Sequence, residues 1–206
     1  MSKLRAILIA NPKGGSGKST LAVSLAGALA TSGQNVRLLD LDKQQSANAW
    51  LARRPADLPA IWSFQPNQST TDKSGWLIID SPAGLHGKNL ERALKMVERV
   101  IVPIAPSLFD MEASRTFLDA LKTEKAIRKE RAFIGMVGMR VTPRTRVAQV
   151  LEDFLQQHEL PILTHLQDTQ AYINAAFDGK SVFDLPAYQT QREREQWIAL
   201  LDWLQQ

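Results

Sequence analysis

Short runs of apolar residues alternate with longer segments of helical periodicity along most of the chain. The apolar runs predict buried strands at 6–10, 35–42, 76–80, 99–106, 132–141 and 161–166. The segments between them predict helices at 19–33, 90–98, 111–130, 146–159 and 169–179. Continuous apolar strands that alternate with helices favour an α/β fold, with a mostly parallel, twisted sheet flanked by helices on both faces.

Two segments depart from this alternation. Residues 53–75 are rich in Pro, Ser, Thr and Asn, and they predict a loop with one short strand at 61–65. The C-terminal segment 192–206 is amphipathic, with apolar residues at helical spacing: Trp197, Leu200, Leu201 and Leu204. This segment carries two arginines against three acids, whereas a membrane-surface helix favours a basic polar face. We therefore expect the helix to pack on the core, and residues 1–206 to form one domain.

Composition narrows the class of protein. With 206 residues, 44% of them hydrophobic, the chain can bury a full core. It has no Cys, which excludes disulfides, thiol nucleophiles and Cys-zinc sites. No apolar run approaches the roughly 18 residues that span a bilayer, and the run at 6–10 is too short for the core of a signal peptide. These features favour a cytoplasmic protein.

Positive charge is concentrated in one part of the chain. The whole chain has a net charge of +4, whereas residues 111–146 hold nine Lys or Arg against four Asp or Glu. Clustered positive charge attracts polyphosphate backbones, so this segment favours sequence-independent, salt-sensitive binding of DNA. A solvated helix face is the alternative interpretation of the same charges.

The candidate chemistry begins after the first predicted strand, with the sequence NPKGGSGKST at 11–20. Glycines let the backbone approach a phosphate chain, and the helix that follows points its positive end at the phosphates. A lysine in such a loop contacts the β- and γ-phosphates, and the next hydroxyl binds Mg²⁺. The sequence therefore predicts a site for ATP or ADP with Mg²⁺, formed by Gly14, Gly15, Ser16, Gly17, Lys18, Ser19 and Thr20.

Carboxylates end two other predicted strands. Asp80 closes the run WLIID, and we expect it to hold Mg²⁺ through a metal-bound water. Asp40 and Asp42 close the strand at 35–42, and one of them is expected to position the water that attacks the γ-phosphate. Because ligands of parallel sheets bind beyond the carboxyl ends of the strands, these acids and the loop at 11–18 should meet at one edge.

Four segments in this order, KGGSGKST, LLDLDKQQSA, LIIDSPAG and VIVPIAPS, resemble the ParA/MinD family of deviant Walker A ATPases. The resemblance covers nearly the whole chain, and residues 170–185 are similar to the corresponding part of small ParA proteins of the ParF type. It implies a P-loop NTPase fold, Mg²⁺-dependent hydrolysis of ATP to ADP and phosphate, and a homodimer that encloses ATP between its subunits.

The resemblance also implies catalytic roles. Lys13 matches the signature lysine, which in this family reaches across the dimer to the partner's nucleotide, and Lys18 matches the P-loop lysine. Asp42 matches the acid that positions the hydrolytic water beside the metal. The family commonly has Pro directly after this acid, and here the position holds Lys43. That departure leaves the stiffness of the loop and its coupling to hydrolysis open.

Further binding roles follow from the same resemblance. Asp80 matches the Walker B aspartate, which together with Ser19 and Asp42 makes the implied metal set. Arg140, which follows the apolar run AFIGMVGM, matches a region that lines the adenine pocket. Pro106 and its neighbours are also expected to approach the base.

Three functions within the family have to be separated. The first is a ParA-type ATPase that binds nonspecific DNA on the nucleoid and is stimulated by a ParB-like or adaptor protein. Its cargo would be a plasmid, or a carboxysome or other protein assembly. The second is a MinD-like, membrane-associated regulator of division or flagellar placement, and the third is a metabolic ATP-dependent enzyme. The charge of segment 111–146 favours the first, without stable membrane anchoring.

Overall fold

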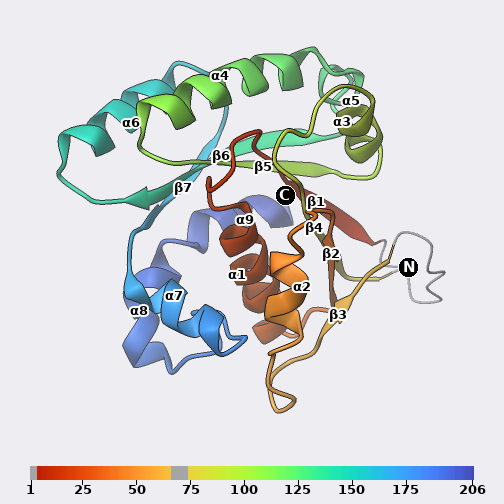
Figure 1. Ribbon diagram of the computed structural model, residues 1–206, viewed down its shortest axis with the longest axis vertical. Helices are drawn as coiled ribbons and strands as arrows, with labels where there is room; N and C mark the ends of the chain where they lie inside the picture. Colours follow the sequence, from red (N-terminus) through yellow and green to blue (C-terminus); the bar gives the residue numbers. More distant parts are fainter. Residues whose placement is uncertain (1–3, 66–73) are drawn as a thin grey trace.

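Within residues 4–65 and 74–206, which the computed structural model describes, seven strands form one parallel sheet (Figure 1). The strands are β1 (Arg5–Ile9), β2 (Val36–Asp40), β3 (Ile61–Ser63), β4 (Trp76–Asp80), β5 (Arg99–Ile104), β6 (Phe133–Val141) and β7 (Ile162–Gln167). Their order in the sheet is β3-β2-β4-β1-β5-β6-β7, and every neighbouring pair is parallel. The strand that leads into the glycine-rich loop, β1, is therefore central.

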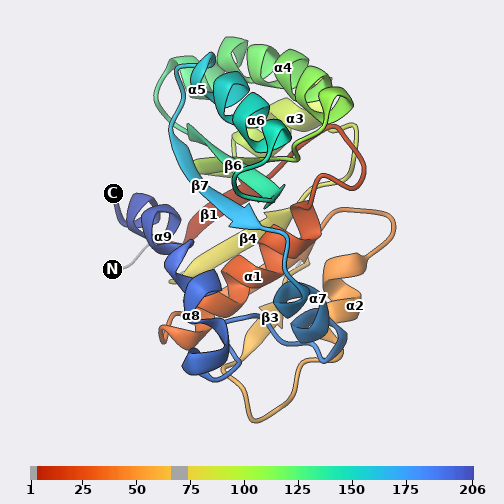
Figure 2. The same ribbon diagram turned by 90° about the vertical axis from the view of Figure 1, so that its left-hand side faces the viewer.

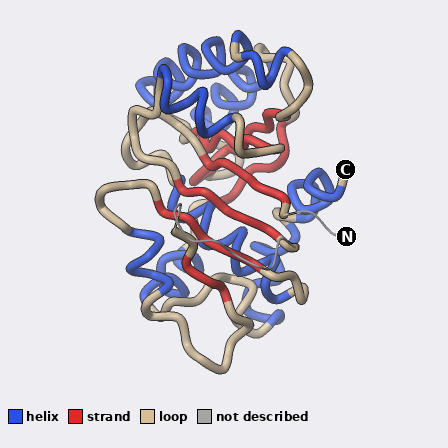
Figure 3. Tube along the Cα trace, turned by 90° about the vertical axis from the view of Figure 1, so that its right-hand side faces the viewer, coloured by secondary structure: helices blue, strands red, loops and turns tan. Residues whose placement is uncertain are grey.

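Helices cover both faces of this sheet (Figures 1 and 2). One face packs against α3 (Gly87–Leu94), α4 (Leu108–Thr123), α5 (Lys125–Arg128) and α6 (Arg146–Gln156). The other face carries α1 (Lys18–Thr31), α2 (Ser46–Leu51), α7 (Gln170–Phe177), α8 (Ala187–Glu195) and α9 (Ile198–Gln205). Figure 3 shows the strands as a layer between the two sets of helices. Each face has its own apolar core, and the predicted fold class is confirmed.

The predicted strands are all present, with differences at their ends. The strand predicted at 35–42 ends at Asp40, because the Asp40 carboxylate accepts a hydrogen bond from the Asp42 backbone N–H and turns the chain. Asp42 consequently lies in the loop after β2 rather than in the strand. In the predicted loop 53–75, β3 supplies the short strand, and residues 66–73 lie outside the described residues.

The prediction of a single helix at 111–130 is wrong in one respect. The chain forms two helices, α4 and α5, and it breaks at Glu124, whose backbone is extended at φ −65° and ψ 138°. After the break, Ala126 and Ile127 pack against the same apolar core that α4 covers. The break thus accompanies the packing of α5 against this core.

The C-terminal segment packs on the core, as expected from its charge. Trp197, Leu200 and Leu204 are fully buried against the face that α1 covers. The segment is divided between α8 and α9, which meet at Gln196 and Trp197. In the described part of the chain, the helices are too short or too polar to cross a membrane.

A buried ion pair fixes the loops behind α1. Arg54 donates hydrogen bonds of 2.8 and 3.0 Å to the Asp184 carboxylate, and the two side chains are only 5% and 0% exposed. Ser181 donates to the same carboxylate from its backbone N–H and its hydroxyl. Burial acts to raise the pKa of Asp184, but the hydrogen bonds from Arg54 and Ser181 outweigh it and lower that pKa. The Ser181 hydroxyl also lies against Gly27 of α1, so this hydrogen-bonded group of side chains packs directly on the helix.

An Asp184→Ala variant is expected to lose about 3–5 kcal/mol of unfolding free energy near pH 7, because Arg54 would stay buried without its partner. The pKa of Asp184 is lower in the folded chain than in the unfolded chain, where it is about 3.9. The contribution of Asp184 to the free energy of unfolding is therefore complete above the unfolded pKa, and it is lost as the pH falls through the folded pKa. Urea unfolding should therefore show a smaller difference between variant and wild type near pH 3. The control Asp178→Ala removes an exposed carboxylate and should change stability by less than about 0.5 kcal/mol. Equal losses in both variants would contradict this role.

Candidate functional site

A cavity of about 480 Å³ lies at the carboxyl edge of the sheet, where β1, β2 and β4 end in register. Asp80 is level with Ile9 across the β1–β4 pair and with Asp40 across the β2–β4 pair. The predicted convergence of loop and carboxylates is thus seen in the sheet register. Residues of the loop and of α1 form one wall: Gly14, Gly15, Gly17, Lys18, Ser19 and Thr20.

The loop after β1 has a backbone that requires glycine. Gly15 and Gly17 have φ angles of +75° and +93°, in the left-handed region that side chains disfavour. At Gly17 a Cβ would also lie 2.8 Å from the Met139 side chain. Directly after Gly17, α1 begins at Lys18, so the positive end of the helix faces the cavity. This arrangement suits an anion.

The two lysines of the loop occupy different environments. Lys18 is only 7% exposed, lines the cavity, and donates a 2.8 Å hydrogen bond to the Lys13 carbonyl. The Ser16 hydroxyl, also buried, donates to the same carbonyl at 3.2 Å. Burial lowers the pKa of Lys18, while the charges of Asp80 and Asp42 oppose that shift. Lys13 itself is exposed and does not form part of the cavity wall in the described structure.

Asp80 is buried and lies close enough to Lys18 and Asp42 to feel their charge. Within the described residues neither of its carboxylate oxygens has a partner at full hydrogen-bond geometry, although the Ser19 hydroxyl lies close enough to act to lower the pKa of Asp80. Burial raises the pKa of Asp80 to about 6. A buried carboxylate with free oxygens beside the Ser19 hydroxyl fits Mg²⁺, which prefers oxygen ligands. The described residues contain no cluster of three His, Cys, Asp or Glu side chains that could hold a metal ion, so a nucleotide and water would supply the other ligands.

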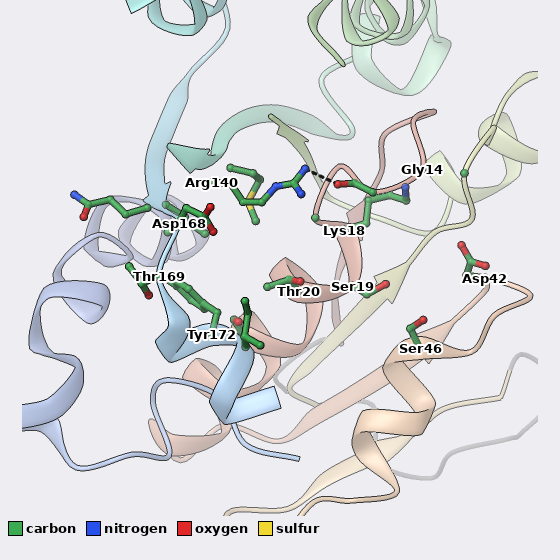
Figure 4. A pocket seen from close by; sticks show the side chains of 18 of the residues that line it. Gly14, Lys18, Ser19, Thr20, Asp42, Ser46, Arg140, Asp168, Thr169 and Tyr172 are labelled. Carbon is green, nitrogen blue, oxygen red and sulfur yellow. Dashed lines mark hydrogen bonds between the residues drawn. The ribbon is translucent and has the colours of Figure 1, made fainter. Parts of the chain in front are cut away.

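The structure separates the roles of the two acids after β2. Asp40 is buried, and its two carboxylate oxygens accept hydrogen bonds from the backbone N–H groups of Asp42 and Asn48, at 3.0 and 3.1 Å. Asp40 therefore shapes the loop. Asp42 is half-exposed and lines the cavity, with one carboxylate oxygen accepting from the Gln44 N–H at 2.9 Å. Only Asp42 of the pair faces the cavity (Figure 4).

Arg140 closes the opposite side of the cavity. Its φ angle is +52°, and it falls in a register shift between β6 and β7 that spans Gly138 to Val141. Such an irregularity redirects a side chain. The Arg140 guanidinium extends over the cavity and donates a 2.7 Å hydrogen bond to the Gly15 carbonyl (Figure 4). Pro106 does not line this cavity, since after β5 the chain turns into α4 on the other face of the sheet.

Part of the cavity wall was not predicted from the sequence. It comes from the end of β7 and the start of α7, and comprises Leu166, Gln167, Asp168, Thr169, Tyr172 and Ile173. The Tyr172 hydroxyl accepts a 2.9 Å hydrogen bond from the indole of Trp197, and burial raises the pKa of Tyr172 to about 12. These residues could have been predicted from the rule that ligands bind beyond the carboxyl ends of parallel strands, which applies to β7 as it does to β1.

A comparison with protein families decides the assignment. The family described as CobQ/CobB/MinD/ParA nucleotide binding domain matches residues 7–182. The chain belongs to this family. The predicted resemblance to ParA and MinD proteins is therefore confirmed, and the cavity lies in a nucleotide-binding domain.

Individual members of the family are similar over nearly the whole chain. Maintenance of carboxysome distribution protein A from Halothiobacillus neapolitanus is 24% identical over 196 residues, which is 90% of each chain. A putative plasmid partition protein from Borrelia burgdorferi, solved with AMPPNP, has a TM-score of 0.74 at 19% identity, over 97% of this chain and 99% of that one. Cobyrinic acid a,c-diamide synthase from Mycobacterium smegmatis, solved with ADP and magnesium, has a TM-score of 0.66 at 20% identity, covering 92% and 97%. At these identities the two structures establish the shared fold.

Proposed function

We propose that this protein is a ParA-type ATPase that binds ATP with Mg²⁺ in the cavity and pairs with a second copy through its nucleotide. The observation that supports this proposal most directly is the separation of the two lysines. Lys18 is buried in the cavity wall, where it can neutralise its own nucleotide, and Lys13 is exposed outside it. A cation that does not face its own cavity is available to a nucleotide held by a partner.

Each residue of the site then has a task. Lys18 and the backbone of residues 14–17 bind the phosphates, Thr20 adds a contact, and Ser19 and Asp80 hold Mg²⁺. The metal would supply charge neutralisation between the phosphates. Asp42 positions the water that attacks the γ-phosphate, at the side of the cavity away from Arg140.

The adenine base would lie toward the wall formed by the end of β7 and the start of α7. Met139 and Leu166 offer apolar contacts there, and Tyr172 stays neutral at physiological pH. Arg140 joins this wall to the phosphate loop through Gly15. The two relatives solved with AMPPNP and with ADP and magnesium support these ligands.

The basic segment 111–146 is divided between the two ends of the sheet. Arg140 lies at the cavity, and Lys122 donates a hydrogen bond to the His158 carbonyl. Four other basic residues are exposed at and after α5, at the end where β6 begins: Lys125, Arg128, Lys129 and Arg131. A second copy would cover the cavity edge, so we assign nonspecific DNA to this α5 group. Such binding would be salt-sensitive and would place the dimer on the nucleoid.

The cargo would be a plasmid or a protein assembly such as a carboxysome. One relative is named for carboxysome distribution and one structural neighbour for plasmid partition. A ParB-like or adaptor protein would stimulate hydrolysis and release the dimer from DNA. The membrane-bound alternative has less support, because Trp197, Leu200 and Leu204 of the C-terminal segment are buried in the core. ATP-dependent binding to anionic vesicles, without binding to random-sequence DNA, would favour that alternative.

An Asp42→Ala variant tests the assignment. It should bind ATP with Mg²⁺ and accumulate as a dimer by light scattering, while hydrolysis falls by about 100-fold or more, since a water-positioning group contributes about that much. The matched control is Asp57→Ala, which removes an exposed carboxylate away from the cavity and should leave both properties unchanged. Wild-type turnover in Asp42→Ala, or no dimer with ATP, would count against this role.

A further inference from the structure

One buried side-chain amide holds the loop where it leaves β1. Asn11 is 0% exposed and makes three hydrogen bonds of 2.8 Å. Its Oδ1 accepts from the backbone N–H of Lys13, and its Nδ2 donates to the Pro103 carbonyl and the Ser114 hydroxyl. Asn11 thereby connects the backbone of the exposed lysine to β5 and to α4.

The Asn11 amide replaces a bond that the β-ladder cannot make. Along the β1–β5 pair, the Ala10 N–H donates to the Ile101 carbonyl at 3.1 Å. Residues of one strand alternate in direction, so the next donor on this side would be residue 12 and the next acceptor Pro103. Pro12 has no N–H. The Asn11 side chain supplies the missing donor, and the chain leaves the sheet at this point.

Ser114 determines which end of the amide faces Lys13. Its hydroxyl is buried and donates its single hydrogen to the Asp110 carbonyl at 2.7 Å, so toward Asn11 it can only accept. The Pro103 carbonyl also needs a donor. Both partners therefore require the amide nitrogen, and the amide oxygen is left to accept from Lys13.

We propose that Asn11 is the positioning residue for Lys13. It fixes the backbone from which the exposed lysine side chain extends, and Ser114 keeps the Asn11 amide in the required orientation. This proposal rests on the proposed function, in which Lys13 contacts the nucleotide of a second copy. Asn11 does not line the cavity in the described structure, and its contact with the loop is to the Lys13 backbone, whose carbonyl also accepts a hydrogen bond from Lys18.

The test compares dimer formation in wild type, Asn11→Ala, Lys13→Ala and the double variant, with AMPPNP and Mg²⁺, by sedimentation. Asn11→Ala should weaken the dimer about tenfold or more, because it leaves buried groups unpaired and releases the Lys13 backbone. Nucleotide affinity of the dilute monomer should change little. The double variant should dimerise no more weakly than Lys13→Ala alone, since two residues acting through one contact are not additive.

The outcomes separate the two proposals. If wild type stays monomeric, or Lys13→Ala dimerises like wild type, the proposed function is wrong. If Lys13→Ala loses the dimer and Asn11→Ala keeps it, or if the two effects add, the positioning role is wrong. Should Asn11→Ala fail to fold, Ser114→Ala carries the same test, with a smaller weakening that disappears in the Lys13→Ala background. Thr116→Ala, an exposed hydroxyl on the same helix, is its control.

Discussion

A Lys13→Ala variant is expected to bind ATP but to lose hydrolysis by about 100-fold or more, because a cation supplied in trans to the transferred phosphate contributes at least that much. Lys18→Ala should fail earlier, at nucleotide binding, since Lys18 lies in the cavity wall. Equilibrium binding of a fluorescent ATP analogue and steady-state phosphate release measure the two steps. Normal turnover of Lys13→Ala would contradict the role in trans.

Mixing variants distinguishes a role in trans from one in cis. Lys13→Ala and Asp42→Ala are each expected to be inactive alone. In a mixed dimer, the site on the Lys13→Ala subunit keeps its own Asp42 and receives an intact lysine from its partner. Turnover should therefore be partly restored when the two variants are combined. No recovery on mixing would indicate that Lys13 serves its own nucleotide.

An Asp80→Asn variant is expected to be more stable than wild type and inactive. Burial raises the pKa of Asp80 from 3.8 to about 6, so the folded chain binds a proton more tightly than the unfolded chain does. Stability is consequently lost as pH rises from about 4 to about 6, and the cost above that range is about 2–3 kcal/mol. Asn carries no charge to bury, so the variant should regain this free energy near pH 7.

Urea unfolding without Mg²⁺ near pH 4 and near pH 7 measures the effect, which should be present at pH 7 and small at pH 4. Hydrolysis by Asp80→Asn should fall by about 100-fold or more, because the metal loses its carboxylate. Asp119→Asn, which changes an exposed carboxylate on α4, should alter neither property. A loss of stability near pH 7 in Asp80→Asn would show that the buried charge is stabilised in the fold.

The sheet could be predicted because its central strands are buried on both faces and form continuous apolar runs. β4 matches its predicted run residue for residue. The break between α4 and α5 could not be read from periodicity, because it goes with the packing of Ala126 and Ile127 against the core, which is a tertiary contact. Sequence patterns define the elements, whereas their ends are set by tertiary packing.

One wall of the cavity was predictable for a similar reason. The phosphate loop is a contiguous stretch, so its glycines and lysines can be recognised as a binding motif from the sequence alone. The opposite wall, with Asp168, Thr169 and Tyr172, is brought to the loop only by the pairing of β5 with β6 and of β6 with β7. Spacing alone left the choice between Asp40 and Asp42 open, and the family resemblance indicated Asp42. The side-chain hydrogen bonds that occupy Asp40 could not be read from the sequence.

The two walls of the cavity differ in how the strands that lead into them are paired. The loop wall continues from β1, which is hydrogen-bonded to β4 on one side and to β5 on the other. The opposite wall continues from β6 and from β7, an edge strand whose pairing with β6 contains two register shifts. A central strand with two partners resists displacement more than an irregular edge strand does. The cavity thus lies between a wall that continues from a central strand with two partners and a wall that continues from an irregularly paired edge strand.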